Sequence, residues 1–375
     1  MRIGIVCYPT FGGSGVLATE LGKALALKGH EVHFISYNQP ARLDFFSENI
    51  FYHEVNIAKY PLFEYAPYET ALAGKMVDIV QSAHLDVLHV HYAIPHASAA
   101  LLAKQILSQH GIEIPVVTTL HGTDITLVGR EMTYEHVVSW SINQSDAVTA
   151  VSEDLKKQTF EHFKIHRDID VIPNFIDFGR FNKKPREHFK QMIAPHGEKI
   201  IIHTSNFRKV KRIEDVIAVF SQIIKEIPAK LLLIGDGPER SHIEKVCREF
   251  NTCDWVTFLG KQEAIEEILS IGDLFILPSE SESFGLAALE AMACEVPVIS
   301  SNAGGIPEVN IHGFTGYLSE VGDVDDMAQN AISLLKDPNL LATFKKNALI
   351  QAHKFDLKEI LLQYEAIYHR VAAKN

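Results

Sequence analysis

Two glutamates in the second half of the chain, Glu282 and Glu290, are separated by seven residues and follow an apolar run at 273–279. At a helical rise of about 1.5 Å per residue their Cα atoms would lie on the order of 10 Å apart. That spacing suits two contacts at different depths of one ligand better than an acid and a base acting on one bond. We predict that Glu282 meets ligand hydroxyls and that Glu290 accepts hydrogen bonds from ribose hydroxyls; a solvated helix position is the alternative for Glu290. The backbone N–H groups expected to accompany Glu282 belong to Ser283, Phe284 and Gly285.

A basic cluster in the segment SNFRKVKR follows another apolar run, at 199–204. It contains Arg208, Lys209, Lys211 and Arg212. Cations held at a strand end stabilise the negative charge that grows on a departing diphosphate. We expect Lys211 and Arg208 to have this role, and we interpret Lys209 and Arg212 as a solvated loop.

The glycine loop GGSG, residues 12–15, follows the first apolar run of the chain. Its spacing loosely fits a dinucleotide-binding fingerprint, but four residues separate it from the strand and the second strand ends without an acidic residue. We therefore do not expect NAD. The free N–H groups at a helix start can instead bind an anion, and this indicates ligand contacts at Gly13, Ser14 and Gly15. A turn that needs a positive φ is the alternative.

Histidines end two further strand-like runs. His89 and His91 precede Tyr92 in LHVHYAIPHASAA, and His121 ends VVTTLH. His89 and His91 share one face of a strand, and an H-x-H pair can bind zinc, but no further ligand motif accompanies it. We expect His91 or Tyr92 to reach a ligand and His89 to be a core residue.

Two series of apolar runs alternate with helical patterns, which predicts two doubly wound α/β domains that face each other. Residues 168–190 interrupt the apolar pattern, so we interpret them as a linker. No strand follows a final helix at about 357–373. The expected domains are 1–168, 169–354 and a C-terminal helix, 355–375, that packs back toward the first domain. The expected strands are 2–8, 31–37, 86–92, 115–121, 146–152, 199–206, 230–237, 255–260, 273–279 and 297–302.

Composition excludes several classes of protein. The 375 residues are 47% hydrophobic and carry a formal net charge of −12, which disfavours nucleic acid and anionic membranes as partners. The four cysteines form no metal-binding pattern, the chain starts with a strand, and no apolar run is long enough to span a membrane. We expect a cytoplasmic protein without a metal or cofactor, and we leave its oligomeric state open.

The segment from Glu282 to Glu290, with PVISSNAGGIPEV after it, resembles the E-x7-E motif of retaining glycosyltransferases with the GT-B fold. In that family the first glutamate lies by the donor sugar and the second binds the nucleotide ribose. The resemblance also implies that His121 lies beside the transferred sugar. The family's usual phosphate-binding arginine is replaced by Asn206, so Arg208 supplies the guanidinium or Asn206 donates a hydrogen bond. Lys261 and Gln262 would offer their backbone to the uracil.

Four segments are similar to those of family members that transfer N-acetylglucosamine from UDP to L-malate in bacillithiol biosynthesis: PTFGGSGVLATELG, HVHYAIPHASAA, LHGTDITLVG and SNFRKVKR. The resemblance implies UDP-N-acetylglucosamine as the donor and L-malate as the acceptor, with no metal required. Alternatives are a glycan or lipid acceptor, or a UDP-sugar epimerase of similar fold. The residues expected to bind the two malate carboxylates are Ser14, Tyr92, Thr119, Thr123 and Arg130.

Overall fold

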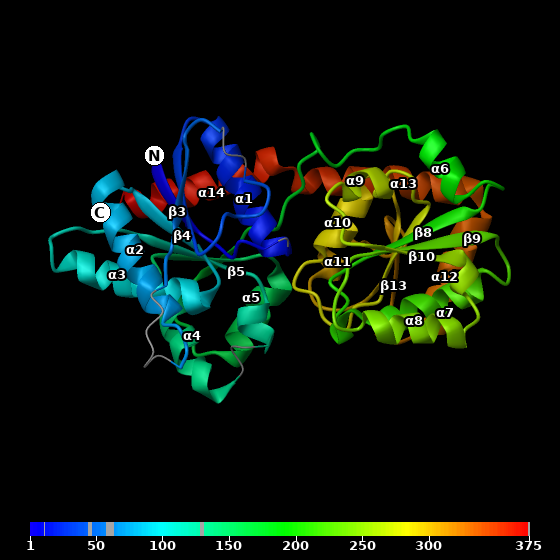
Figure 1. Cartoon of the computed structure of the whole chain (residues 1–375), viewed down its shortest axis with the longest axis horizontal. Helices are drawn as coiled ribbons and strands as arrows, with labels where there is room; N and C mark the ends of the chain where they lie inside the picture. The colour runs from blue at the N-terminus through cyan, green and yellow to red at the C-terminus, as the bar shows by residue number, and fades with distance from the viewer. Residues whose placement is uncertain (11, 44–46, 58–63, 128–130, 374–375) are drawn as a thin grey trace. The chain divides into compact units, whose positions relative to one another are not determined.

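The computed structural model describes the chain apart from residues 11, 44–46, 58–63, 128–130 and 374–375 (Figure 1). The chain forms two compact units. Unit 1 contains Met1–Asn174 and Leu357–Asn375, and unit 2 contains Phe175–Asp356. No described helix is long and apolar enough to cross a membrane.

Unit 1 is built on a parallel sheet of seven strands in the order β3-β2-β1-β4-β5-β6-β7. Four neighbouring strands in the interior of the sheet are almost wholly buried: β1, β4, β5 and β6. Burial on both faces explains why their sequences are nearly continuous apolar runs. The strands are β1 (Arg2–Val6), β2 (Glu31–Ser36), β3 (Ile50–Glu54), β4 (Val87–His91), β5 (Val116–Leu120), β6 (Ala147–Ala150) and β7 (Ile169–Val171).

Helices connect these strands, and the last helix of the chain joins the same unit. Helix α14 packs on α1 and β4, and its Glu365 pairs with Lys28 while Arg370 pairs with Asp170. The C-terminal helix therefore packs against the first sheet and is part of unit 1, as the sequence predicts. The helices of unit 1 are α1 (Gly13–Leu27), α2 (Tyr68–Ala83), α3 (Ser98–Ser108), α4 (Met132–Gln144), α5 (Glu153–His162) and α14 (Leu357–Ala372), with short π-helical turns η1 (Ala93–Ala97) and η2 (Thr123–Leu127).

Unit 2 has a parallel sheet of six strands in the order β10-β9-β8-β11-β12-β13. Its main apolar core lies between this sheet and helices α7, α8, α12 and α13. The strands are β8 (Lys199–Thr204), β9 (Ala229–Ile234), β10 (Val256–Gly260), β11 (Leu274–Leu277), β12 (Val298–Ser301) and β13 (Gly316–Ser319). The helices are α6 (Glu187–Ile193), α7 (Ile213–Ile223), α8 (Arg240–Glu249), α9 (Ile265–Leu269), α10 (Leu286–Ala293), α11 (Ile306–Val309), α12 (Val324–Lys336) and α13 (Pro338–Ala352), with 3-10 turns η4 (Lys209–Lys211), η5 (Cys253–Trp255) and η6 (His353–Phe355).

Both sheets have the doubly wound topology that the alternating pattern predicts, and the ten expected strands are confirmed. Three strands were not predicted: β3, β7 and β13. Strand β7 pairs with β6 and so lies in unit 1, although the sequence places residue 169 after the first domain boundary. The two compact units divide after Asn174 and after Asp356.

Candidate active site

Several of the predicted site residues lie where each sheet reverses its strand order. In unit 1 the reversal lies between β1 and β4, and in unit 2 between β8 and β11. Loops at the carboxyl ends of such strand pairs diverge and leave room for a ligand. Ser14 lies at the start of α1, the helix that follows β1; Tyr92 follows β4, Lys211 follows β8 and Glu282 follows β11.

Lys211 and Glu282 meet at the carboxyl edge of the unit 2 sheet. Lys211 Nζ donates a charge-assisted hydrogen bond to Glu282 Oε1, and Ser279 Oγ lies 3.4 Å from the same oxygen. Both charged side chains are largely buried, at 19% and 16% exposure. A cation and a carboxylate held together at this edge can contact the phosphate and the sugar of one ligand.

Glycines bring the backbone close to these two residues. An added Cβ at Gly304 would lie 1.9 Å from the Glu282 carbonyl oxygen, and Gly305 N donates to the same oxygen at 2.9 Å. An added Cβ at Gly237 would lie 2.0 Å from the Asn206 carbonyl oxygen, in the loop that leads to Lys211. Only glycine allows such close approach, so these positions fix the loops of the site.

Glu282 lies in the loop before α10, which begins at Leu286. Gly285 precedes the helix with φ +97°, a left-handed conformation that favours glycine. Phe284 is 1% exposed and its ring packs against Phe355, so its side chain is a core residue of unit 2. Ser283 and Glu290 are partly buried, with Glu290 on α10.

The remaining predicted donor residues lie on loops of the same unit. Asn206 and Arg208 are exposed and follow β8, on the path to Lys211. Lys261 and Gln262 are exposed and follow β10, and the Gln262 amide donates to the Leu259 carbonyl at 2.6 Å. The structure thus places them at the carboxyl side of the sheet, with Lys261 and Gln262 in the loop after the outermost strand, β10.

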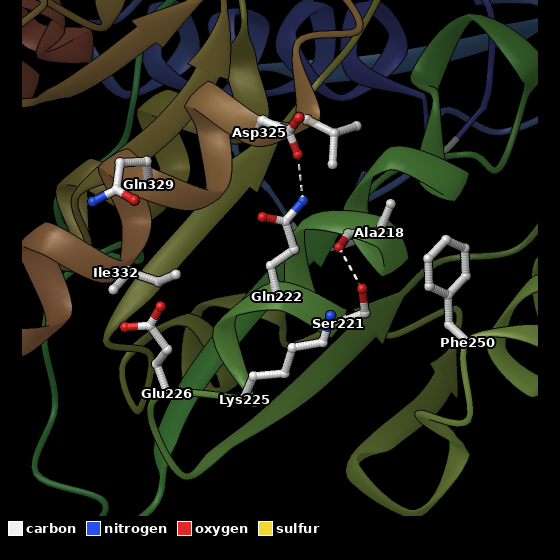
Figure 2. Close-up of a pocket in the computed structure, with 10 residues that line it drawn as sticks. Ala218, Ser221, Gln222, Lys225, Glu226, Phe250, Asp325, Gln329 and Ile332 are labelled. Atoms are coloured by element: carbon white, nitrogen blue, oxygen red, sulfur yellow. Dashed lines mark hydrogen bonds between the residues drawn. The ribbon is translucent and has the colours of Figure 1, made fainter.

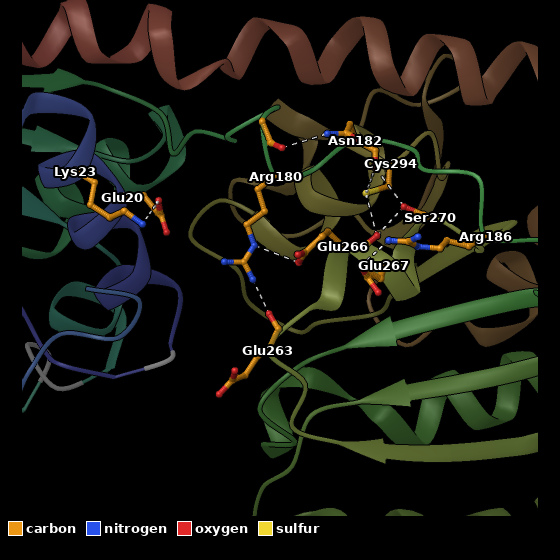
Figure 3. A network of polar contacts seen from close by, with 11 residues as sticks. Glu20, Lys23, Arg180, Asn182, Arg186, Glu263, Glu266, Glu267, Ser270 and Cys294 are labelled. Carbon is orange, nitrogen blue, oxygen red and sulfur yellow. Dashed lines mark hydrogen bonds and ion pairs between the residues drawn. The ribbon is translucent and has the colours of Figure 1, made fainter. Parts of the chain in front are cut away.

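The segment 180–186, before α6, is bonded to α9, the helix that follows Lys261 and Gln262. Arg180 Nε pairs with Glu266 Oε2 at 3.2 Å, and its guanidinium also bonds the Glu263 carbonyl at 2.5 Å (Figure 3). Arg186 pairs with Glu267 at 2.6 Å. The region interpreted as a linker is therefore bound tightly to α9, and no sequence pattern indicated these contacts.

In unit 1, Ser14 at the start of α1 meets Tyr92 at the end of β4. Their hydroxyl oxygens are 2.6 Å apart. Gly13 is exposed and Ser14 is partly buried, so the first N–H groups of α1 face solvent. Gly15 is buried because its Cα packs against the loop, where an added Cβ would lie 2.5 Å from the Tyr8 carbonyl. Gly15 therefore holds the loop, while Gly13 and Ser14 present the positive end of the helix.

Histidines line the ends of β4 and β5 in unit 1. His91 Nδ1 lies 2.8 Å from His121 Nε2, and His89 Nε2 lies 2.7 Å from Thr119 Oγ1. Burial lowers the pKa of His89 and of His121 to about 3 and holds the pKa of His91 well below its usual range. All three rings are therefore neutral near pH 7 and add no positive charge to the site.

The other residues predicted to bind the acceptor differ in exposure. Thr119 is fully buried, and its hydroxyl bonds both His89 and Thr149, so it supports the strand ends and offers no surface to a ligand. Thr123 is exposed at the start of η2. Arg130 lies outside the described residues.

Asp124 and His203 are polar positions that the sequence analysis did not select. Asp124 is 2% exposed and accepts hydrogen bonds from the N–H groups of Ala93 and Gly122, so it ties the β4 and β5 ends together. Burial raises its pKa to about 6. His203 donates to or accepts from Ser205 Oγ at 2.9 Å under the loop that leads to Lys211. A polar residue inside the apolar run KIIIHT was the available signal for His203.

A cavity of about 470 Å³ lies elsewhere in unit 2, between α7 and α12. Figure 2 shows Gln222 bonded to Asp325 across it, with Phe250 at one side. None of the predicted site residues lines it. Among the described residues, no group of three or more His, Cys, Asp or Glu could hold a metal ion.

Comparisons with known proteins agree with this fold. The family model described as "Glycosyltransferase Family 4" matches residues 11–180, and the model described as "Glycosyl transferases group 1" matches residues 184–351. The structure of HepE from Anabaena in complex with UDP-glucose superposes with a TM-score of 0.82 at 21% identity, over 99% of this chain and 100% of that one. Sucrose-phosphate synthase from Thermosynechococcus elongatus superposes with a TM-score of 0.81 at 22% identity, over the whole of both chains.

The chain belongs to the group 1 and family 4 glycosyltransferases, and its two parallel sheets have the GT-B fold, as the E-x7-E resemblance implies. Among curated relatives it is 49% identical over 373 residues to N-acetyl-alpha-D-glucosaminyl L-malate synthase of Bacillus anthracis, which covers 99% of this chain and 97% of that protein. It is 27% identical over 372 residues to the uncharacterized glycosyltransferase MJ1178 of Methanocaldococcus jannaschii, covering 98% and 97%.

Proposed function

We propose that this glycosyltransferase moves N-acetylglucosamine from UDP-N-acetylglucosamine to the hydroxyl of L-malate, with retention at the anomeric carbon. The observation that carries the proposal is the full-length likeness, at 49% identity, to the Bacillus anthracis protein named for that product. A cytoplasmic location fits four cysteines that are all unpaired.

The donor is assigned to unit 2. Lys211 and Arg208 stabilise the negative charge that grows on the departing UDP, because cations fixed in advance need no reorganisation as the bond breaks. Glu290 accepts from the ribose hydroxyls, and Glu282 meets the sugar with the N–H groups of residues 283–285. Asn206, Lys261 and Gln262 complete the nucleotide contacts. His121 is assigned to the transferred sugar.

The acceptor is assigned to unit 1. The two carboxylates of malate need positive potential, and the nearby histidines are neutral near pH 7. The exposed N–H groups at the start of α1 and the hydroxyls of Ser14 and Tyr92 can provide hydrogen bonds instead. Thr123 and Arg130 are further candidates, whereas buried Thr119 acts through His89.

The experiment measures UDP release from UDP-N-acetylglucosamine with L-malate, D-malate, lactate and glycerol at equal concentration. L-malate is expected to exceed lactate by tenfold or more, because lactate has only one carboxylate and leaves the donors to the second without a partner. Equal rates with lactate or glycerol would reject the dicarboxylate site and favour a glycan or lipid acceptor. Conversion of the donor into another UDP-sugar, without an acceptor and without net release of UDP, would favour an epimerase.

A second arm adds EDTA, then magnesium or manganese. If Lys211, Arg208 and backbone N–H groups meet the phosphate charge, turnover with L-malate stays unchanged. Turnover that collapses in EDTA and returns with the metal would contradict that assignment.

A further inference from the structure

His91 has one nitrogen with a partner and one without. The side chain is 2% exposed, and His91 Nδ1 lies 2.8 Å from His121 Nε2. Its Nε2 is buried and has no hydrogen-bond partner among the described residues. Buried polar atoms without a partner are rare, so this one limits where the protons of the two rings can be.

The surrounding groups are committed to other partners. His89 uses Nδ1 toward Tyr368 Oη at 2.8 Å and Nε2 toward Thr119 Oγ1 at 2.7 Å. His96 Nδ1 lies 2.6 Å from the His91 carbonyl oxygen, and it must donate there because a carbonyl can only accept. The adjacent imidazoles therefore leave His91 Nε2 unpaired, although the His89 ring centroid is only 4.5 Å from that of His91.

Two proton arrangements are open to a pair of neutral rings that share one hydrogen bond. If His121 Nε2 donates, His91 carries its own proton on Nε2, and a buried N–H is left without an acceptor. If His91 Nδ1 donates, His91 Nε2 is a bare lone pair. Unpaired N–H groups are rarer in protein interiors than incompletely satisfied acceptors, so the second arrangement is favoured.

We propose that His91 is a positioning residue that donates from Nδ1 to His121 Nε2 and so fixes the proton of His121 on Nδ1. His121 then presents an N–H donor to the ligand and has no basic lone pair available to remove the acceptor's proton. This inference rests on the proposed placement of His121 beside the transferred sugar.

Two substitutions separate the hydrogen bond from the packing. His91→Asn places an amide N–H near the position of Nδ1 and keeps the donor, whereas His91→Phe keeps a ring beside His121 and removes the donor. We expect His91→Phe to lower kcat with L-malate by about tenfold, the scale of one hydrogen bond. We expect His91→Asn to remain within about threefold of the parent, and the affinity for UDP, which is assigned to unit 2, to be unchanged in both.

The direct measurement is the ¹⁵N spectrum of the enzyme labelled on histidine, with the His121 signals identified by their loss in His121→Asn. The proposal expects His121 to be protonated on Nδ1 in the parent and in His91→Asn, and to lose that single form in His91→Phe. Protonation of His121 on Nε2 in the parent enzyme would overturn it, as would equal kcat in His91→Phe and the parent.

The spectrum needs no acceptor and no turnover. It therefore tests the tautomer even if L-malate fails in the acceptor panel, and a correct acceptor with the wrong tautomer would reject only the role of His91. If His91→Phe does not fold, the parent spectrum alone still decides.

Discussion

At the residue scale, the proposed donor site contains a lysine whose charge is paired with a carboxylate. Lys211 is bonded to Glu282, and both are largely buried. Its neighbour Lys209, two residues earlier in the same 3-10 turn, is exposed. The two lysines therefore form a matched pair for testing the role of the buried charge.

Lys211→Ala is expected to lower kcat by roughly 10²–10³, because one fixed donor to the growing phosphate charge is lost. Lys209→Ala should change kcat by less than about threefold, since an exposed cation is screened by solvent. Steady-state rates of UDP release measure both. Similar losses in the two variants would mean that the loop acts only through its net charge.

Glu290→Ala is expected to weaken UDP binding by roughly 1–3 kcal/mol, because a ribose hydroxyl pair loses its acceptor. Calorimetric titration with UDP measures this. Glu267→Ala, which removes an exposed partner of Arg186 on α9, is the control and should bind UDP normally. Unchanged UDP affinity in folded Glu290→Ala would return Glu290 to a solvated helix position.

At the scale of elements, sequence predicted best where an element is buried on both faces. Strands such as β1 and β8 are continuous apolar runs and were located correctly. Strand β3 was missed because it is a half-exposed edge strand, and β13 because it has four residues and begins with Gly316. Short or exposed strands are stabilised by their neighbours more than by their own pattern.

The site follows the same division. Motif spacing predicted Glu282, Lys211 and the glycine loop as site residues, and in the structure each follows the carboxyl end of a parallel strand of its own unit. Their contacts with a ligand stay a prediction, as does that of Glu290 on α10. Motif spacing could not distinguish exposed Thr123 from Thr119, whose hydroxyl is buried between His89 and Thr149. That difference depends on contacts between residues far apart in the sequence.

Gly304 offers a test at this scale. Gly304→Ala is expected to weaken UDP binding at least tenfold, because its Cβ would meet the Glu282 carbonyl at 1.9 Å and push the loop away. Gly313 is the matched control, since it also has a positive φ, +72° against +56°, but nothing lies within 4 Å of an added Cβ.

Gly313→Ala should lower the free energy of unfolding by about 1 kcal/mol through backbone strain and leave UDP binding intact. Calorimetric titration and urea unfolding measure the two effects. Equal UDP affinity in both alanine variants would show that Gly304 is needed only for its positive φ and not to let the Glu282 loop approach closely.

At the scale of the whole molecule, buried neutral histidines are unevenly distributed. Among the described residues, burial lowers the pKa of His53, His89, His91, His96 and His121 in unit 1, but only of His203 in unit 2. An unfolded histidine binds a proton below about pH 6.5 while these folded ones do not, so acid favours unfolding. Asp124 has the opposite effect and offsets about one of these histidines, because its raised pKa favours the folded state as the pH falls below about 6.

Unit 1 is therefore expected to lose stability faster than unit 2 between pH 7 and pH 5. Each unit contains one tryptophan, Trp140 on α4 and Trp255 in η5, so Trp255→Phe and Trp140→Phe leave one fluorescent reporter each. The urea midpoint reported by Trp140 should fall further than the midpoint reported by Trp255. Equal shifts in the two midpoints would contradict the prediction.

The return of α14 to unit 1 has a consequence for how the protein is made. The ribosome delivers β1 to β7 first and α14 only after all of unit 2, yet Tyr368 of α14 bonds His89 on β4 and Glu365 bonds Lys28. During synthesis the first sheet therefore lacks α14, and His89 Nδ1 lacks its Tyr368 partner, until all of unit 2 has been synthesised. Unit 2 is continuous in sequence, so all of its residues have been synthesised before α14 is. Unit 1, although its strands are synthesised first, is therefore the last unit to gain its full set of contacts.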